Sequence, residues 1–176
     1  CSFSGNVLNG LTLEETKAVL KHCSAEINRK AGFASTTSEV EVEAARFLSN
    51  QLEGLVLSGG SAQLRKLEVT DNGQEGVRAT NVTELRIEFS RVGRNRSNGL
   101  QIVNANASAI LSTVVFSNAG RGVLIWDSPE AFIWNNLVYA NGSTGIAVDG
   151  SITGSYACRI LQNTVAFNNN RGVLIG

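Results

Sequence analysis

The chain has 176 residues, with 15 acidic and 15 basic residues and a single His. A formal net charge of zero argues against a nucleic-acid partner held by bulk electrostatics. No window approaches the roughly 18 consecutive apolar residues of a membrane-spanning helix, so we expect no membrane span. The hydrophobic fraction of 43% is enough for one continuous core.

The chain is organised by a repeat that opens with Gly and continues with two apolar residues at alternate positions. The opening glycines are Gly10, Gly32, Gly54, Gly76, Gly99, Gly122, Gly145 and Gly172. Residues 1–9 precede the first of them and are interpreted as a lead-in. Self-similarity at a nearly fixed period, with strand periodicity inside each unit, predicts a solenoid of β-rungs. Seven rungs are complete, and an eighth begins at Gly172.

A column of asparagines supports the same register independently. One Asn falls at the same place in every rung, at Asn28, Asn50, Asn72, Asn95, Asn118, Asn141 and Asn168. Stacked amides at about 4.8 Å can bond to the rungs above and below, and Asn tolerates the left-handed conformation of tight turns. The column therefore predicts a structural ladder of asparagine side chains.

Three apolar columns follow the alternation expected of strands. The first strand points inward at pairs such as Leu100 and Ile102, and the second and third strands contribute columns that include Ile133 and Val138. Three strands per rung predict an all-β tube of triangular cross-section. Rung seven has extra residues between its first two strands, and we interpret Asp149 to Ala157 as an inserted surface loop.

The segment from Ile133 to Asn141 reads Ile-x-Asn-Asn-x-Val-x-x-Asn. It resembles the repeat of right-handed parallel β-helix proteins, the pectin-lyase-like superfamily. The resemblance is strong over 54–176 and weaker over 10–53. It implies the right-handed parallel β-helix fold and an extracellular or cell-surface location. Calcium is a candidate cofactor through this resemblance alone. The fold hosts lyases, hydrolases, epimerases, tailspikes and adhesins, so it does not specify an activity.

Residues 10–53 admit a second interpretation. Thr12 and Glu15 form a capping-box pattern, and Leu13, Leu20 and Ile27 recur at heptad spacing, so an N-terminal helical cap is the alternative to β-rungs there.

The three cysteines are Cys1, Cys23 and Cys158. Cys23 and Cys158 would lie six rungs apart, roughly 29 Å at about 4.8 Å per rung, which is too far for a disulfide. We therefore draw no conclusion about compartment from the thiols. Cys1 followed by Ser2 would suit a lipoprotein, with lipid on an N-terminal Cys, against the simpler interpretation of a fragment boundary.

The outward side of the first strand carries the candidate binding site. Trp126 can stack on a sugar ring, with Gln101, Asp127 and Asp149 about one rung away to bond its hydroxyls. Arg121 borders this face in the turn after the third strand, and arginine suits carboxylates. Together they predict a site for polysaccharide, with uronate-rich polymers as the candidate ligand. The alternatives are that Trp126 packs under the inserted loop and that the arginine is simply solvated.

The sequence contains no complete catalytic constellation of the superfamily. Arg159-Ile160-Leu161 and Trp126-Asp127-Ser128-Pro129 are only partial matches to its motifs, and no Cys and His cluster has metal-ligand spacing. We leave the catalytic residues unassigned. The alternatives to a binding protein are a non-catalytic spacer or adhesin stalk, and an enzyme such as a lyase or epimerase with catalytic residues partly outside this chain.

A second surface feature is apolar. Phe132 and Trp134 face outward on the second strand, with Leu111 and Leu161 beside them and Leu137 near them on the third strand. A contiguous exposed apolar patch usually marks an interface. It makes self-association a second candidate, as do the open ends of the solenoid, which expose strand edges.

Overall fold

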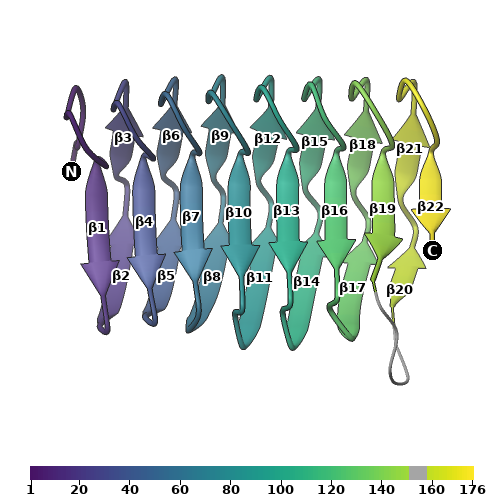
Figure 1. The fold of residues 1–176 in the computed structure, drawn as a ribbon, viewed down its shortest axis with the longest axis horizontal. Coiled ribbons are helices and arrows are strands. Elements are labelled where there is room, and N and C mark those ends of the chain that lie inside the picture. Colours follow the sequence, from purple (N-terminus) through teal and green to yellow (C-terminus); the bar gives the residue numbers. More distant parts are fainter. Residues whose placement is uncertain (151–157) are drawn as a thin grey trace.

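The computed structural model describes residues 1–150 and 158–176. Its strands form three parallel sheets, and the chain passes through them in turn, so that each rung contributes one strand to each sheet (Figure 1). This is the predicted right-handed parallel β-solenoid of seven complete rungs. No helix occurs in the part of the chain that the structure describes.

The first sheet has eight strands and the other two have seven each. The strands of the first sheet are β1 (Leu11–Glu14), β4 (Phe33–Thr36), β7 (Leu55–Ser58), β10 (Val77–Thr80), β13 (Leu100–Val103), β16 (Val123–Trp126), β19 (Ile146–Asp149) and β22 (Val173–Ile175). Those of the second sheet are β2 (Lys17–Lys21), β5 (Glu39–Glu43), β8 (Ser61–Arg65), β11 (Glu84–Glu88), β14 (Ala107–Leu111), β17 (Glu130–Trp134) and β20 (Arg159–Leu161). Those of the third sheet are β3 (Ser24–Glu26), β6 (Arg46–Leu48), β9 (Glu68–Thr70), β12 (Arg91–Gly93), β15 (Val114–Phe116), β18 (Leu137–Tyr139) and β21 (Thr164–Ala166).

The core fills the inside of the tube with the predicted apolar columns. Leu100, Ile102 and Ile133 are each at most 1% exposed, and the inward residues of all three sheets join one buried cluster. Residues 10–53 belong to the same structure, since β1 to β6 pair in parallel with the strands of the next rung. The segment offered as a helical cap therefore forms β-rungs.

The asparagine ladder is present. From Asn28 to Asn141, each ladder Nδ2 donates to the Oδ1 of the next rung's asparagine at 2.9 to 3.0 Å. The same Oδ1 accepts the backbone N–H of the preceding asparagine at 3.0 to 3.2 Å. The ladder therefore carries two hydrogen bonds per step between rungs.

The ladder asparagines lie in the turn after the third strand of each rung, but they are not the residues with the left-handed conformation. Positive φ angles, between 52° and 62°, occur at the residue immediately before each ladder asparagine: Ile27, Ser49, Asp71, Arg94, Ser117, Ala140 and Phe167. At this turn some buried backbone groups have no partner in a neighbouring strand. The asparagine side-chain amide forms hydrogen bonds with them, because a buried N–H must be paired. The choice of Asn thus reflects hydrogen bonding rather than tolerance of positive φ.

The Gly column has a steric reason. A Cβ placed on Gly99 would lie 2.7 Å from Asn118 Nδ2 and 2.7 Å from the carbonyl oxygen of Gly122. Such contacts are shorter than van der Waals separations, so a side chain here would push apart the ladder and the next rung. The two columns that identify the repeat are therefore one packing arrangement.

Residues 1–9 follow the path of the last third of a rung. The Asn6 Nδ2 donates to Asn28 Oδ1 at 2.9 Å, which makes Asn6 a further member of the ladder. Phe3 packs against the core, and Ser2 pairs with Ser24 in a parallel bridge. The repeat thus begins before Gly10.

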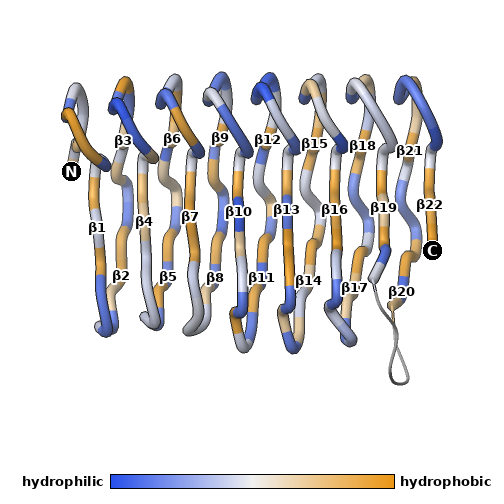
Figure 2. Tube along the Cα trace, viewed as in Figure 1, coloured by the Kyte–Doolittle hydropathy of each residue, from blue (hydrophilic) through white to orange (hydrophobic). Residues whose placement is uncertain are grey.

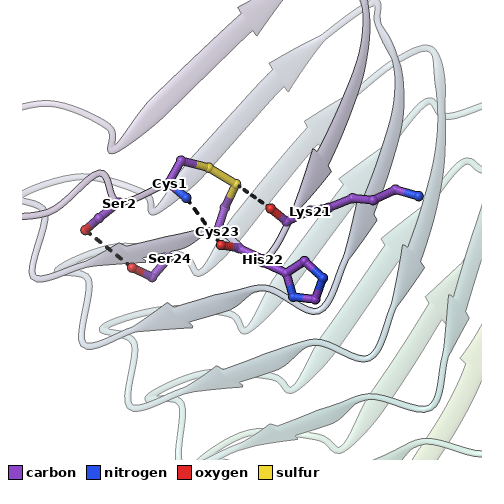
Figure 3. The surroundings of a disulfide bond; sticks show 6 residues. All are labelled: Cys1, Ser2, Lys21, His22, Cys23 and Ser24. Carbon is purple, nitrogen blue, oxygen red and sulfur yellow. Dashed lines mark hydrogen bonds between the residues drawn. A yellow bond between two sulfur atoms is a disulfide. The ribbon is translucent and has the colours of Figure 1, made fainter.

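Cys1 and Cys23 form a disulfide, which was not expected from the sequence (Figure 3). Their separation of 22 residues equals one rung, so stacking brings their Cα atoms to 4.5 Å. The distance between Cys23 and Cys158 gives no indication of this bond, which depends on residues 1–9 forming part of a rung. Cys158 is a free thiol, and partial burial raises its pKa.

Charge is divided along the solenoid. Ion pairs connect neighbouring rungs of the N-terminal part, including Lys17 with Glu39 at 2.7 Å and Arg94 with Asp71 at 2.7 Å. Figure 2 shows orange stretches in first-sheet strands of both halves, such as β7 and β16, but only six of the 30 charged residues come after Gly99. The later rungs therefore present a less charged surface.

Candidate functional site

The outer face of the first sheet places Trp126 beside an aspartate. Trp126 ends β16 and is 40% exposed, and its register partner on β19 is Asp149. Adjacent parallel strands lie about 4.8 Å apart, so the indole and this carboxylate belong to neighbouring outward positions. This end of the first sheet combines an aromatic surface with a hydrogen-bond acceptor.

Asp127 lies at the corner that follows Trp126. Its φ is 47°, and its backbone N–H donates to the carbonyl of Asp149 at 3.1 Å. A Cβ added to Gly150 would meet Asp127 Oδ1, so this carboxylate lies against the start of the next corner. Asp149 Oδ1 accepts the N–H of Gly150 at 2.9 Å. Asp127 is thus bonded through its backbone, and Asp149 through its carboxylate, at the corners of two neighbouring rungs.

Gln101 is half-buried on β13, and its register partner is Leu124 rather than Trp126. Its Oε1 accepts a hydrogen bond from Asn98 Nδ2 at 2.7 Å. Asn98 Oδ1 in turn accepts the backbone N–H of Arg121 at 2.8 Å. Asn98 was not among the residues expected at this site, although its place one residue before an opening glycine could have indicated it.

Arg121 lies at the opposite end of the strand from Trp126. The two residues are five positions apart along the chain, on the order of 16 Å at roughly 3.3 Å per residue. The five candidate residues therefore form a cluster at Trp126, Asp127 and Asp149, with Gln101 and Arg121 toward the other edge of the sheet. A ligand that touches all of them must be longer than a single sugar.

The same face carries an ion pair that was not expected from the sequence. Arg78 points outward from β10, and its Nη2 donates to Glu53 Oε1 at 2.8 Å. The Glu53 side chain is only 4% exposed, so a buried carboxylate holds this guanidinium at the edge of the sheet. Its signal in the sequence is weak, because the partners are 25 residues apart and lie on different rungs.

The predicted apolar patch is present on the second and third sheets. Phe132, Trp134 and Leu137 are 36 to 39% exposed. The Trp134 Nε1–H donates to Gln162 Oε1 at 2.7 Å, and Phe116 stacks on Tyr139 at 5.8 Å between ring centroids. Leu111 is buried at 8% exposure, so the patch is narrower than predicted.

Neither a metal cluster nor a membrane helix emerges from the described residues. Within 1–150 and 158–176, no group of three or more His, Cys, Asp or Glu could hold a metal ion. Ca²⁺ takes six to eight oxygen ligands, and the Asp127 and Asp149 carboxylates do not supply such a set. In the same ranges, no helix is long and apolar enough to cross a bilayer. The inserted loop assigned to Asp149 to Ala157 lies largely outside the described residues.

Comparison with known proteins identifies the class. The family model described as "Right handed beta helix region" matches residues 53–176. The chain belongs to this family of right-handed β-helix regions. Comparison with curated protein sequences gave no significant match.

Two solved structures share the fold. The A-module of mannuronan C-5 epimerase AlgE6 from Azotobacter vinelandii is 14% identical with a TM-score of 0.78, and the match covers 97% of this chain and 57% of that one. A mutant of the periplasmic alginate epimerase AlgG is 12% identical with a TM-score of 0.69, and the match covers 96% of this chain and 48% of that one. This chain thus spans about half the length of these proteins.

Proposed function

We propose that this β-helix binds an acidic polysaccharide along the outer face of its first sheet. The observation that carries the proposal is the exposed Trp126 indole, which lies beside Asp149 on an otherwise regular strand face. A saturated sugar ring packs well on such a surface, and the neighbouring carboxylates accept its hydroxyl hydrogens. The two similar structures are named as epimerases, one of mannuronan and one of alginate, and this likeness of fold supports the choice of ligand.

A uronate polymer would lie along the strands. Its sugar ring stacks on Trp126 at one edge, and a carboxylate of a neighbouring sugar reaches Arg121 at the other edge. Arginine binds carboxylates through two parallel hydrogen bonds. Because Asp127 and Asp149 repel anions, the carboxylates of the polymer are placed away from Trp126 and toward Arg121.

The disulfide is informative about the compartment in which the protein works. Disulfides persist in oxidising compartments and are rare in the cytosol, so the Cys1–Cys23 bond supports an extracellular or periplasmic place for the protein. The sulfur of Cys1 is bonded to Cys23, whereas attachment of a lipid needs that sulfur free. The lipoprotein alternative is therefore not part of the proposal.

A glycan array tests the assignment with three forms of the protein. The native chain should bind uronate polymers, and Trp126→Ala should weaken that binding at least tenfold, which corresponds to about 1.4 kcal/mol. The matched control is Trp134→Ala, which removes the other tryptophan from a different sheet and should leave binding unchanged. Equal loss in both variants, or unchanged binding by Trp126→Ala, would contradict the assignment.

The second candidate is a spacer whose rungs provide length. The apolar patch favours it, because Phe132, Trp134 and Leu137 could join two copies or a neighbouring chain. This candidate predicts no glycan binding by any of the three forms, together with a concentration-dependent molecular mass that Trp134→Ala reduces. Sedimentation analysis of the same samples distinguishes the two functions.

A further inference from the structure

A groove of about 420 Å³ crosses the outer face of the second sheet, away from the proposed polysaccharide face. Small-molecule sites commonly have volumes of about 300 to 1,000 Å³. Its floor is formed by Ala107 and Ala109, the outward residues of β14. They are small, whereas the rungs on both sides carry long side chains, and this difference creates the groove.

Two carboxylates face each other across this floor. Glu84 and Glu130 are the register partners of Ala107 on β11 and β17, so their Cα atoms are two rungs apart, about 9.6 Å. Both side chains are exposed and make no ion pair within the described residues. Two like charges that converge on one gap favour a cation between them.

The other end of the groove is aromatic. Phe132 is 37% exposed and is the register partner of Ala109, so its ring forms one wall. Arg86 on the opposite rung also lines the groove and is paired with Glu88, a carboxylate that it shares with Arg65. Arg159, the register partner of Phe132 on the next rung, lines the same end of the groove. The groove therefore has a flat floor, two acidic acceptors at one end, and an aromatic platform flanked by two arginines at the other.

We propose that this groove binds an amino-sugar residue whose amine is protonated. The C–H face of the ring packs on Phe132 and the alanine methyl groups, and the ammonium donates to Glu84 and Glu130. An ammonium close to an aromatic ring gains further attraction. A uronate carboxylate is disfavoured at the end of the groove that holds Glu84 and Glu130, because it would meet the same two glutamates. This site is independent of the first-sheet site, and its glutamate end favours a sugar that carries an ammonium.

The test measures binding of a glucosamine trimer by calorimetry in a mildly acidic buffer, with the N-acetylglucosamine trimer and a uronate trimer as comparison ligands. The native protein should bind the glucosamine trimer at least tenfold more tightly than the acetylated one, which carries no ammonium. The double variant Glu84→Gln with Glu130→Gln should lose this preference. The control Glu14→Gln removes one exposed carboxylate from the first sheet and should bind as the native protein does.

A variant with unchanged charge distinguishes binding in the groove from non-specific attraction of cations to the glutamates. Ala107→Leu fills the floor without changing any charge, and should weaken binding of the glucosamine trimer at least tenfold. If Ala107→Leu binds as the native protein does while the glutamine variants bind weakly, the interaction is non-specific and the proposal is wrong. Equal affinity for both neutral and cationic trimers, or no binding of either, would also overturn it. Trp126→Ala should leave this binding unchanged, so the outcome does not depend on the first-sheet proposal.

Discussion

Asn95 illustrates how a single side chain connects three rungs. It is 1% exposed, donates from Nδ2 to Asn118 Oδ1 at 2.9 Å and to the carbonyl of Val69 at 3.3 Å, and accepts from Asn72 at 3.0 Å. Its Oδ1 also accepts the backbone N–H of Asn72. The amide therefore satisfies buried groups on both neighbouring rungs.

Replacement of this residue, Asn95→Ala, should lower the free energy of unfolding by about 3 kcal/mol, because several buried polar groups lose their partners. Urea unfolding followed by circular dichroism measures the change. Asn170→Ala is the control, since Asn170 is exposed and outside the ladder, and it should shift stability by less than about 0.5 kcal/mol. Similar losses for both variants would show that the ladder bonds contribute little.

Two buried serines, one on the second sheet and one at the corner after it, should respond to replacement by alanine with opposite changes in stability. Ser108 Oγ is buried and has no hydrogen-bond partner among the described residues. Ser90 Oγ accepts the N–H of Leu67 at 3.0 Å and donates to the carbonyl of Glu88 at 2.8 Å. Ser108→Ala should stabilise the protein by about 1 kcal/mol, whereas Ser90→Ala should destabilise it by about 1 to 2 kcal/mol. Thermal unfolding of both variants tests the pair, and destabilisation by Ser108→Ala would mean that its hydroxyl is satisfied in solution.

At the scale of the elements, one ion pair connects the corners after β9 and β12. Arg94 donates from Nε and Nη2 to the two carboxylate oxygens of Asp71 at 2.8 and 2.7 Å. These hydrogen bonds lower the pKa of Asp71 below its ordinary value. A carboxyl group with a lowered pKa stabilises the fold above its unfolded pKa, and this contribution is lost as the pH falls through the folded pKa.

Arg94→Gln should therefore raise the pKa of Asp71 toward its ordinary value. Both partners are about half exposed, so the stability lost at neutral pH should not exceed about 1 kcal/mol. The difference between variant and native protein should shrink as the pH falls below about 4. Titration of the Asp71 carboxyl by NMR measures the shift, with Arg96→Gln as the control. An unchanged Asp71 pKa in Arg94→Gln would show that the pair does not persist in solution.

The strand pattern was predictable because inward and outward residues alternate and each rung repeats the same columns. The register that places Trp126 beside Asp149 follows from the Gly column, and it is found in the structure. Asn6 and the Cys1–Cys23 bond were missed because residues 1–9 contain only part of a rung and lack an opening glycine. The groove was missed for a different reason: its depth depends on the contrast between Ala107 and long side chains on both neighbouring rungs, and small residues leave no periodic signal.

At the scale of the whole molecule, each rung contacts only its neighbours, so stability is distributed along the solenoid. The disulfide closes a loop of one rung at the N-terminal end. A crosslink of this length contributes about 3 kcal/mol in the chain-entropy account. In a solenoid the disulfide should therefore stabilise the terminal rung rather than the whole tube.

Reduction of the disulfide should therefore speed amide exchange locally. The N–H groups of Phe3 and Gly5, which donate to the carbonyls of Ser24 and Glu26, should exchange faster in reducing buffer. The N–H of Leu100, in the middle of the tube, should be unaffected. Hydrogen exchange measured by NMR distinguishes this local increase from a uniform loss of protection. A uniform loss would mean that the solenoid unfolds as a single unit.

The central functional claim is that Trp126 on the first sheet contacts the polysaccharide. The chain has two tryptophans, so Trp134→Phe leaves Trp126 as the only one and its fluorescence reports on this site alone. The most direct measurement is a titration of this variant with uronate oligomers, followed by tryptophan emission and by calorimetry. The account predicts a saturable change in emission with the same dissociation constant as the heat of binding. Binding heat without any change in emission, or no binding at all, would contradict it.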